Sequence, residues 1–252
     1  MIKLILLTLC LGSLTTLAQD NEPSKRSHAI YSGKLTILKS LNLDQTHRLK
    51  LKLAIEAGST YTNSDHTSIL AGTYYTLPYK QRLGVFISSH TGTRHNDDWN
   101  IKQGNWSWKD TSKRSETILH LTHTIKKRLS SLPLIYELAS EIQHNTFNEQ
   151  NSLLLGPSIH YFHLEDGLPH LSTRVKLPVY FALNFGEEKI YKYGIYLAEI
   201  YHYTKKVSIA LNYEFLVERW STSDDFDRLN PNESYMSEEE TNKFSVEIIG
   251  SF

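Results

Sequence analysis

The chain has 252 residues, and its 27 basic and 27 acidic residues leave no formal net charge. This balance argues against the basic footprint of a nucleic-acid-binding protein and against an electrostatic funnel for acidic substrates. The mean hydropathy of −0.38 is that of a soluble protein, but 15 tyrosines and 4 tryptophans make the chain rich in aromatic residues. A transmembrane β-barrel can have such averages, because only every second residue of its strands faces lipid and aromatic residues line its interfaces.

The first 18 residues have the organisation of a secretory signal peptide. Lys3 provides a positive start, an apolar core runs from Leu4 to Leu14, and the small residue Ala18 stands where a signal peptidase would cut. The alternative is an uncleaved membrane anchor, which needs roughly 20 apolar residues. Cys10, the single cysteine, lies in this segment without the small preceding residues of a lipoprotein signal. The mature chain is therefore expected to fold without disulfides.

Residues 19–46 precede the first strong strand pattern. Within them, the stretch 29–43 alternates weakly between apolar and polar residues. We interpret 19–46 either as an N-terminal periplasmic segment or as an extra strand. Residues 47–252 are interpreted as one barrel domain, because no repeat or low-complexity linker divides them.

Ten segments after residue 46 are predicted to be β-strands, because apolar and polar residues alternate with a period of two. In the first of them, Leu51 and Leu53 share one face, and Lys50 and Lys52 share the other. The segments are as long as a tilted membrane strand of about 9–11 residues. They lie near residues 47–61, 67–77, 82–92, 116–129, 134–143, 151–164, 171–185, 189–204, 207–218 and 244–252.

Three residues do not fit regular membrane strands. Pro157 and Pro178 lack the backbone donor that a central strand uses, so we expect bulges at both. Segment 189–204 is apolar or aromatic on both faces. The register that turns Tyr191 and Tyr193 outward also turns Glu199 toward lipid.

The connections between the predicted strands alternate in length. Short turns fall near residues 77–81, 130–133, 165–167 and 204–206, and long loops span 93–115 and 220–241. If the last strand runs toward the periplasm, the short turns lie inside and the long loops outside, as in outer-membrane barrels. A soluble β-sandwich would also alternate, but its strands are usually only ~5–6 residues long. We therefore predict an all-β antiparallel transmembrane barrel of about 10 strands, an even number, with 12 as the alternative.

The end of the chain is an alternating segment whose apolar residues share one face. They are Phe244, Val246, Ile248 and the last residue, Phe252. This ending resembles the C-terminal assembly signal of bacterial outer-membrane β-barrel proteins, with Gly250 where that family more often has an aromatic residue. The resemblance implies a monomer in the outer membrane of a Gram-negative bacterium, in contact with lipid and lipopolysaccharide. It also implies that the barrel assembly machinery is a partner during biogenesis.

Aspartates in the two long loops are one candidate for catalysis. Asp97 and Asp98 lie in the first loop, and Asp224 and Asp225 lie in the second. Carboxylates that face one another across the barrel mouth could activate water, as in an omptin-like protease. Solvated loops are rich in aspartate for conformational reasons too, and the flanking residues do not match the omptin pattern.

A serine and a histidine at the outer end of one strand are the second candidate. Ser88 and His90 share a strand face, about 6–7 Å apart along the strand. A lipid hydrolase needs such a pair at the lipid-facing rim, with a third group to orient the histidine. The residue order of barrel phospholipases and lipid A deacylases is absent here, so a non-enzymatic protein is favoured.

The twelve histidines do not predict a metal site, because no pair has ligand spacing with a third ligand nearby. His120 and His160 are expected to face the lumen and His123 the lipid. No metal and no cofactor are expected.

Charged residues on the predicted inner faces should form a network, because the interior of a ten-stranded barrel is narrow and unpaired charges there are costly. The network comprises Lys50, Lys52, Glu56, Glu137, Glu141, Arg174, Lys176, Glu214 and Glu247. A lumen filled in this way predicts a structural or surface-interaction protein that acts through loops 93–115 and 220–241. The alternatives are a narrow channel for small polar solutes and a rim-located hydrolase of lipid or peptide.

Overall fold

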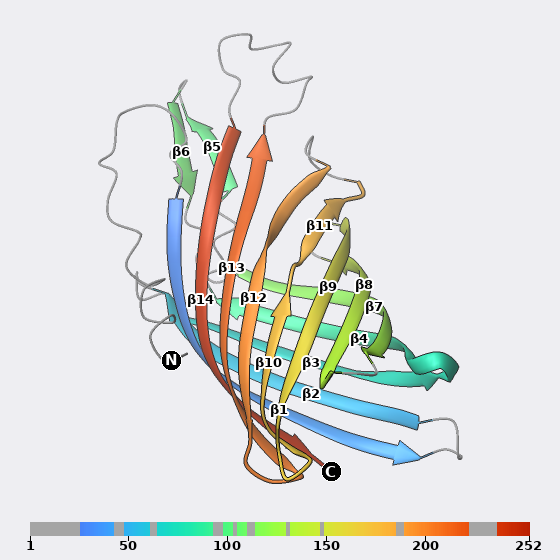
Figure 1. Cartoon of the computed structure of the whole chain (residues 1–252). Helices are drawn as coiled ribbons and strands as arrows, with labels where there is room; N and C mark the ends of the chain where they lie inside the picture. Colours follow the sequence, from blue (N-terminus) through green and yellow to red (C-terminus); the bar gives the residue numbers. More distant parts are fainter. Residues whose placement is uncertain are drawn as a thin grey trace.

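The computed structural model describes residues 26–42, 48–60, 65–92, 98–102, 105–109, 114–129, 132–146, 149–184, 189–221 and 236–252 (Figure 1). The strands of the main sheet are β1 (Arg26–Asn42), β2 (Arg48–Thr60), β3 (Asp65–Leu77), β4 (Gln81–Gly92), β7 (Arg114–Leu129), β8 (Leu134–Asn145), β9 (Gln150–Glu165), β10 (Leu168–Lys176), β11 (Val179–Ala182), β12 (Ile190–His202), β13 (Val207–Ser221) and β14 (Met236–Ser251). A short 3-10 turn, η1 (Pro78–Lys80), joins β3 to β4. Within the described stretches, no helix is both long and apolar enough to cross a membrane.

The main sheet is a closed barrel of eleven strand positions, in which β10 and β11 follow each other between the same two neighbours, β9 and β12. The predicted all-β antiparallel barrel is confirmed, but the expected even number of strands is wrong. The additional strand is β1, which comes from the weakly alternating stretch 29–43 and lies parallel to β14 (Figure 1, blue beside red). Hairpin connections reverse the chain at every step, so an odd number of strands brings the first and last into the same direction. The pair that closes the barrel then has to be parallel.

The last strand is paired along both edges as far as the end of the chain. β14 lies between β13 and β1. The backbone N–H of Phe252 donates to the carbonyl of Leu38 at 2.8 Å, and the N–H of Ser40 donates to the carbonyl of Phe252 at 2.9 Å. These hydrogen bonds hold a chain end that would otherwise fray.

The two prolines within predicted strands behave differently. Pro178 interrupts the strand between β10 and β11, but the register against β9 and β12 is the same on both sides of it. The bulge expected at Pro178 is therefore wrong in position, because the register against β12 shifts only between Tyr180 and Phe181. Pro157 lies in an unbroken register with β8, and its carbonyl accepts the N–H of Leu177 at 2.9 Å. The bulge expected at Pro157 is wrong.

The connections divide the barrel into two unlike ends. At the short-turn end, η1 and residues 130–133, 166–167 and 203–206 join neighbouring strands. Asp166 and Gly167 both have positive φ, 50° and 76°, which suits a two-residue hairpin turn and favours an Asp-Gly pair. At the long-loop end, the connection from β4 to β7 contains a separate hairpin of β5 (Asp98–Lys102) and β6 (Asn105–Lys109), and the connection from β13 to β14 covers residues 222–235.

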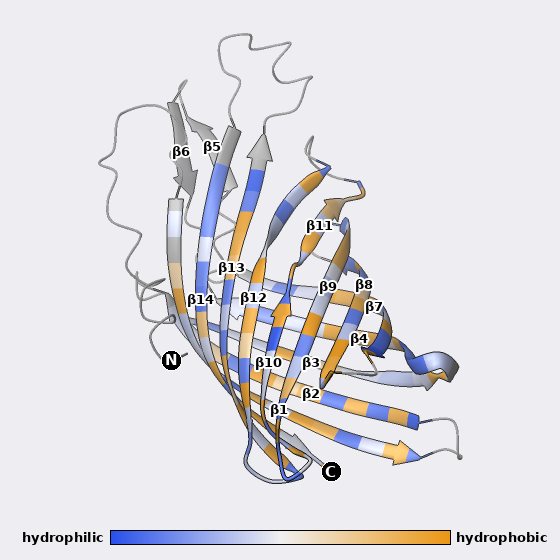
Figure 2. Cartoon of the chain, in the orientation of Figure 1, coloured by the Kyte–Doolittle hydropathy of each residue, from blue (hydrophilic) through white to orange (hydrophobic). Residues whose placement is uncertain are grey.

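The outer face of the barrel carries an apolar belt, which Figure 2 shows as orange positions alternating with blue along the strands. Val85 and Leu211 are each 61% exposed, and Leu121 is 53% exposed. The apolar residues of the proposed assembly signal, Phe244, Val246, Ile248 and Phe252, belong to this face. Polar partners alternate with them and point inward, so the period-two pattern of the sequence corresponds to the two faces of one sheet.

Candidate functional site

Several of the side chains that point into the lumen are buried among one another. Exposed fractions fall to 4% for Phe86 and Leu154 and to 8% for Asn212. Phe86 lies against the inward positions Gly72 and Gly84, where a Cβ atom would collide with its ring. Glycine at these two positions leaves the space that the aromatic ring occupies.

The tightest group of charges surrounds Glu137 on β8. Its carboxylate accepts a hydrogen bond from Arg174 Nη2 at 2.9 Å and pairs with Lys126 Nζ on β7. The Glu137 side chain is only 7% exposed. Of the predicted network, the structure thus brings Glu137 and Arg174 together across β8 and β10. Lys126 was missed, although the alternation of its own strand places it on the inner face.

Two further glutamates connect the strands that close the barrel. Glu56 on β2 pairs with Lys243 on β14. Glu247 on β14 accepts a hydrogen bond from Thr36 Oγ1 at 2.6 Å and lies 3.7 Å from Lys34 Nζ. Both glutamates belong to the predicted network, but their partners do not, because β1 and the first part of β14 were not predicted to be strands.

Four residues of the predicted network form no ion pair within the described part of the chain. They are Lys50, Lys52, Lys176 and Glu214. Lys52 interacts electrostatically with Glu247 and Glu141 at longer range. The network is therefore several separate clusters rather than one continuous chain of charges.

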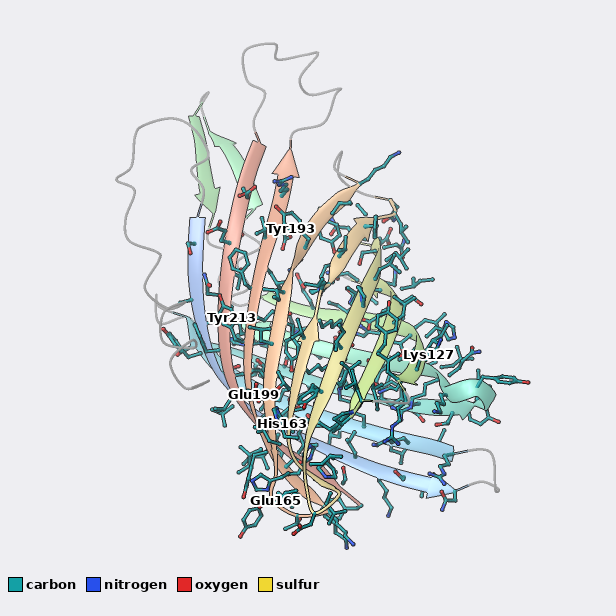
Figure 3. The ribbon with its side chains drawn as sticks, in the orientation of Figure 1. Lys127, His163, Glu165, Tyr193, Glu199 and Tyr213 are labelled. Carbon is teal, nitrogen blue, oxygen red and sulfur yellow. The ribbon has the colours of Figure 1, made fainter. Side chains whose placement is uncertain are left out.

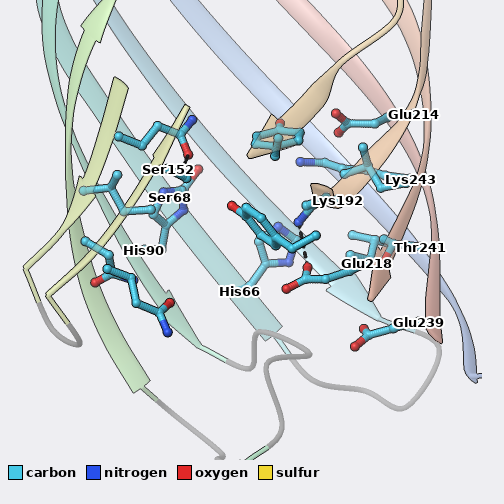
Figure 4. A pocket seen from close by; sticks show the side chains of 18 of the residues that line it. His66, Ser68, His90, Ser152, Lys192, Glu214, Glu218, Glu239, Thr241 and Lys243 are labelled. Carbon is cyan, nitrogen blue, oxygen red and sulfur yellow. Dashed lines mark hydrogen bonds and ion pairs between the residues drawn. The ribbon is translucent and has the colours of Figure 1, made fainter. Parts of the chain in front are cut away.

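A cavity of about 360 Å³ lies in the lumen at the long-loop end (Figure 4). Lys192 Nζ donates to Glu218 at 3.0 Å within it and lies 5.7 Å from the centre of the Tyr180 ring. A smaller cavity of about 70 Å³ continues inward from it. The charged residues that line the larger cavity are Glu56, Glu214, Glu218, Glu239, Lys192 and Lys243.

Ser88 has two histidine neighbours on the inner face. Its Oγ atom lies 3.0 Å from His90 Nε2 and 2.8 Å from His120 Nε2. His120 Nδ1 in turn lies 2.7 Å from Glu141 Oε1, which also accepts a hydrogen bond from Gln143 Nε2 at 2.7 Å. Ser88 and His90 therefore meet, but inside the barrel and not at the lipid-facing rim where we expected them. His120 on β7 and Glu141 on β8 were both expected on the inner face, but sequence reasoning did not connect them with Ser88.

The aspartates proposed for the rim cannot be placed together. Asp97, Asp224 and Asp225 lie outside the described residues, and of Asp98 only the backbone, in β5, is described.

The outer face carries a small polar group on β9, β10 and β12. Glu199 points outward, as the sequence register implied, and accepts a hydrogen bond from Thr173 Oγ1 at 2.9 Å. His163 Nε2 lies 3.4 Å from the same hydroxyl. Figure 3 shows Glu199 and His163 nearer the short-turn end than Tyr193. Tyr191, by contrast, lines the inner cavity, because the register shift opposite Tyr180 and Phe181 reverses its direction.

The histidines are distributed over both faces of the sheet. His120 and His160 face the lumen, where each approaches an inward serine. His123 is on the outer face, 3.0 Å from the side-chain oxygen of Gln81. The described residues contain no cluster of three or more histidine, cysteine, aspartate or glutamate side chains suited to a metal ion.

A comparison of the sequence with the models of known protein families and with characterised proteins gave no match.

Proposed function

We propose that this protein is an outer-membrane β-barrel of a Gram-negative bacterium. We propose that residues 1–18 are a signal peptide that directs its export and is then cleaved. The exposed apolar belt supports this proposal, because a soluble protein rarely exposes so much contiguous apolar surface. Closure of the sheet supports it too, since a membrane strand can leave no backbone group unpaired. In this setting the belt contacts lipid and the polar long-loop end contacts lipopolysaccharide. The protein acts as a monomer, and the barrel assembly machinery inserts it.

We further propose that the barrel is a scaffold with a closed lumen and not a channel. The observation that carries this proposal is the burial of Glu137, whose side chain is only 7% exposed between Arg174 and Lys126. A water-filled path through the lumen would leave such side chains exposed to solvent. The function then lies in what the long-loop end presents, namely the polar cavity and the loops 93–115 and 220–241.

The experiment that tests the closed lumen is single-channel recording in planar bilayers with the refolded chain lacking residues 1–18. We expect no conductance steps from the unchanged protein, because the ion-paired side chains fill the lumen. The double variant Glu137→Ala, Arg174→Ala should show steps or a steady leak, since it removes the charged plug and leaves space for water.

The matched control is the double variant Lys192→Ala, Glu218→Ala. It also removes one inward ion pair, but from the wall of a cavity that is already present, so it should stay silent. Insertion is established separately, by flotation of the protein with vesicles. Stable, ion-selective steps from the unchanged protein would contradict the scaffold and establish a channel for small polar solutes.

A further inference from the structure

Ser88, His120 and Glu141 have the relative positions of a nucleophile, a general base and the carboxylate that orients the base. Ser88 Oγ lies 2.8 Å from His120 Nε2, and His120 Nδ1 lies 2.7 Å from Glu141 Oε1. Both distances fall within the range of roughly 2.6–3.2 Å at which such groups exchange a proton. The same constellation occurs on unrelated folds and is recognised by geometry, whatever the fold that carries it.

The hydrogen-bond partners indicate where the protons lie. A carboxylate can only accept, so His120 Nδ1 carries the proton that it donates to Glu141. In the neutral ring, Nε2 is then free to accept the Ser88 hydroxyl proton. His90 Nε2 lies 3.0 Å from the same hydroxyl on its other side. In the His90 tautomer that carries its proton on Nε2, His90 donates to Ser88 Oγ, and the hydroxyl proton then points at His120.

The three residues lie directly beneath the cavity at the long-loop end. On each of the three strands, the next inward residue toward that end lines the cavity: His90 follows Ser88, Ile118 precedes His120, and Gln143 follows Glu141. The triad is thus one inward position below the cavity floor. Ser88 itself is 2% exposed, and the hydrogen-bonded His90 ring separates it from the cavity. The His90 side chain therefore has to rotate before a substrate can reach Ser88.

The cavity walls indicate the class of substrate. Its volume of about 360 Å³ suits a small organic molecule. Four glutamates and two lysines line it, and both lysines are already paired with glutamates, Lys192 with Glu218 and Lys243 with Glu56. An anionic substrate would meet an excess of negative charge, whereas a neutral or cationic one would not.

We propose that Ser88 and His120 are the catalytic residues of an esterase site at the cavity floor, with Glu141 as a positioning residue, and that its substrates are small neutral or cationic carboxylic esters. Ser88 Oγ attacks the ester carbonyl carbon, and its proton passes through His120 Nε2 to the departing alcohol, which leaves an acyl group on Ser88. A water molecule then attacks the acyl carbon and gives a proton to His120. Ser88 regains this proton as the carboxylic acid leaves.

Turnover at this site is expected to be slow. β4 is paired with β3 and β7 on its two edges at Ser88, so the backbone N–H groups there are used in the sheet and no pair of them is available as an oxyanion hole. Such donors usually contribute about 10²–10³-fold to the rate. Formation of the acyl-serine is therefore a better readout than multiple turnover.

The experiment is covalent labelling of the refolded, detergent-solubilised protein with a small uncharged fluorophosphonate, followed by peptide mass spectrometry. We expect one label, on Ser88. Ser88→Ala should abolish it, and His120→Ala should lower the labelling rate by ~10²–10⁴-fold. Glu141→Gln, a nearly isosteric change, should lower it less. His90→Ala should raise it, because it uncovers the serine. Acyl transfer from 4-nitrophenyl acetate should exceed that from the anionic 4-nitrophenyl hemisuccinate.

The matched control is Ser172→Ala. Ser172 is buried and bonded to a histidine, His202, whose second ring nitrogen contacts Ser208 and, among the described residues, no carboxylate. Labelling of Ser88 should be unchanged in this variant. Absence of label on Ser88 in both the unchanged protein and His90→Ala would overturn the proposal, as would label on Ser88 that is independent of His120. Neither result depends on whether the barrel conducts ions, so the esterase site and the closed scaffold fail or survive separately.

Discussion

Ser88–His120 and Ser172–His202 are two of the serine–histidine pairs that face the lumen. They lie toward opposite ends of the barrel and differ in the group that contacts the second ring nitrogen of the histidine. Near the long-loop end, Ser88 bonds His120, and the far ring nitrogen of that histidine meets the carboxylate of Glu141. At the short-turn end, Ser172 Oγ lies 3.0 Å from His202 Nε2. The serine–histidine distances are 2.8 Å and 3.0 Å, so the pair alone does not distinguish the two sites.

The two sites differ in the group that contacts the second ring nitrogen of the histidine. His202 Nδ1 lies 3.1 Å from Ser208 Oγ, and a hydroxyl can donate or accept, so it fixes neither tautomer of the ring. A carboxylate can only accept and also stabilises the imidazolium that forms when the serine proton is taken. The pair at the short-turn end thus needs no explanation beyond the hydrogen bonding of a buried serine by an inward histidine. The pair near the cavity also has a carboxylate, Glu141, which can orient the histidine as a general base.

The same contrast holds for the two halves of the lumen. In the half that contains Arg174 and Lys126, the carboxylate of Glu137 is only 7% exposed. The long-loop half contains the cavity, and there the carboxylate of Glu218 is 32% exposed. Charges in the first half are held for stability, and those in the second are placed where a ligand can reach them.

The largest expected effect on stability comes from removing a charge in the half of the lumen that contains Glu137. Glu137→Ala removes a carboxylate that is only 7% exposed and leaves the part-buried Arg174 and Lys126 without it, so it should lower the free energy of unfolding by up to about 3–5 kcal/mol. Glu218→Ala removes one partner of a more exposed pair and should cost only about 0–1 kcal/mol. Urea-induced unfolding in lipid vesicles, followed by tryptophan fluorescence, measures both. Equal losses of unfolding free energy would mean that the charges in the two halves are equally buried, and would contradict the proposed difference between them.

A second, smaller effect tests the packing itself. Ser158 lies opposite Glu137 in the same half of the lumen and is 3% exposed, so Ser158→Leu should overpack the lumen and cost about 1–3 kcal/mol. Ser68 faces the cavity, so Ser68→Leu has room for the larger side chain and should be close to neutral. The same unfolding measurement applies, and a cost at Ser68 as large as that at Ser158 would contradict the assignment of free space to the long-loop half.

The barrel could be predicted from the sequence because each strand is determined by residues close together in the chain. Apolar and polar residues alternate with a period of two along each strand, and turn residues such as Asp166 and Gly167 mark where strands end. The eleventh strand was harder, because β1 alternates only weakly and its membership depends on the parallel pairing with the distant β14.

The pairing of side chains across strands could not be predicted in the same way. The inward direction of Ser88, His120 and Glu141 follows from alternation, and their strands are neighbours in the barrel. What brings the three together is the register of β4 against β7 and of β7 against β8. That register depends on the lengths of the connections and the tilt of every strand. A shift of two residues would preserve all the inward faces and still separate the serine from its base.

The smallest expected effect gives the sharpest form of the comparison. Ser88→Ala and Ser172→Ala each remove one buried hydroxyl that bonds an inward histidine, so both should lower the free energy of unfolding by a similar amount, about 0.5–1.5 kcal/mol. Stability therefore cannot separate the two sites, but labelling can, because of these two serines only Ser88 has a base that a described carboxylate orients. Matching losses of stability together with fluorophosphonate label on Ser88 alone would show that Glu141, and neither burial nor the serine–histidine contact, converts a structural hydrogen bond into a reactive one. Label on both serines would show instead that a buried serine–histidine contact is sufficient.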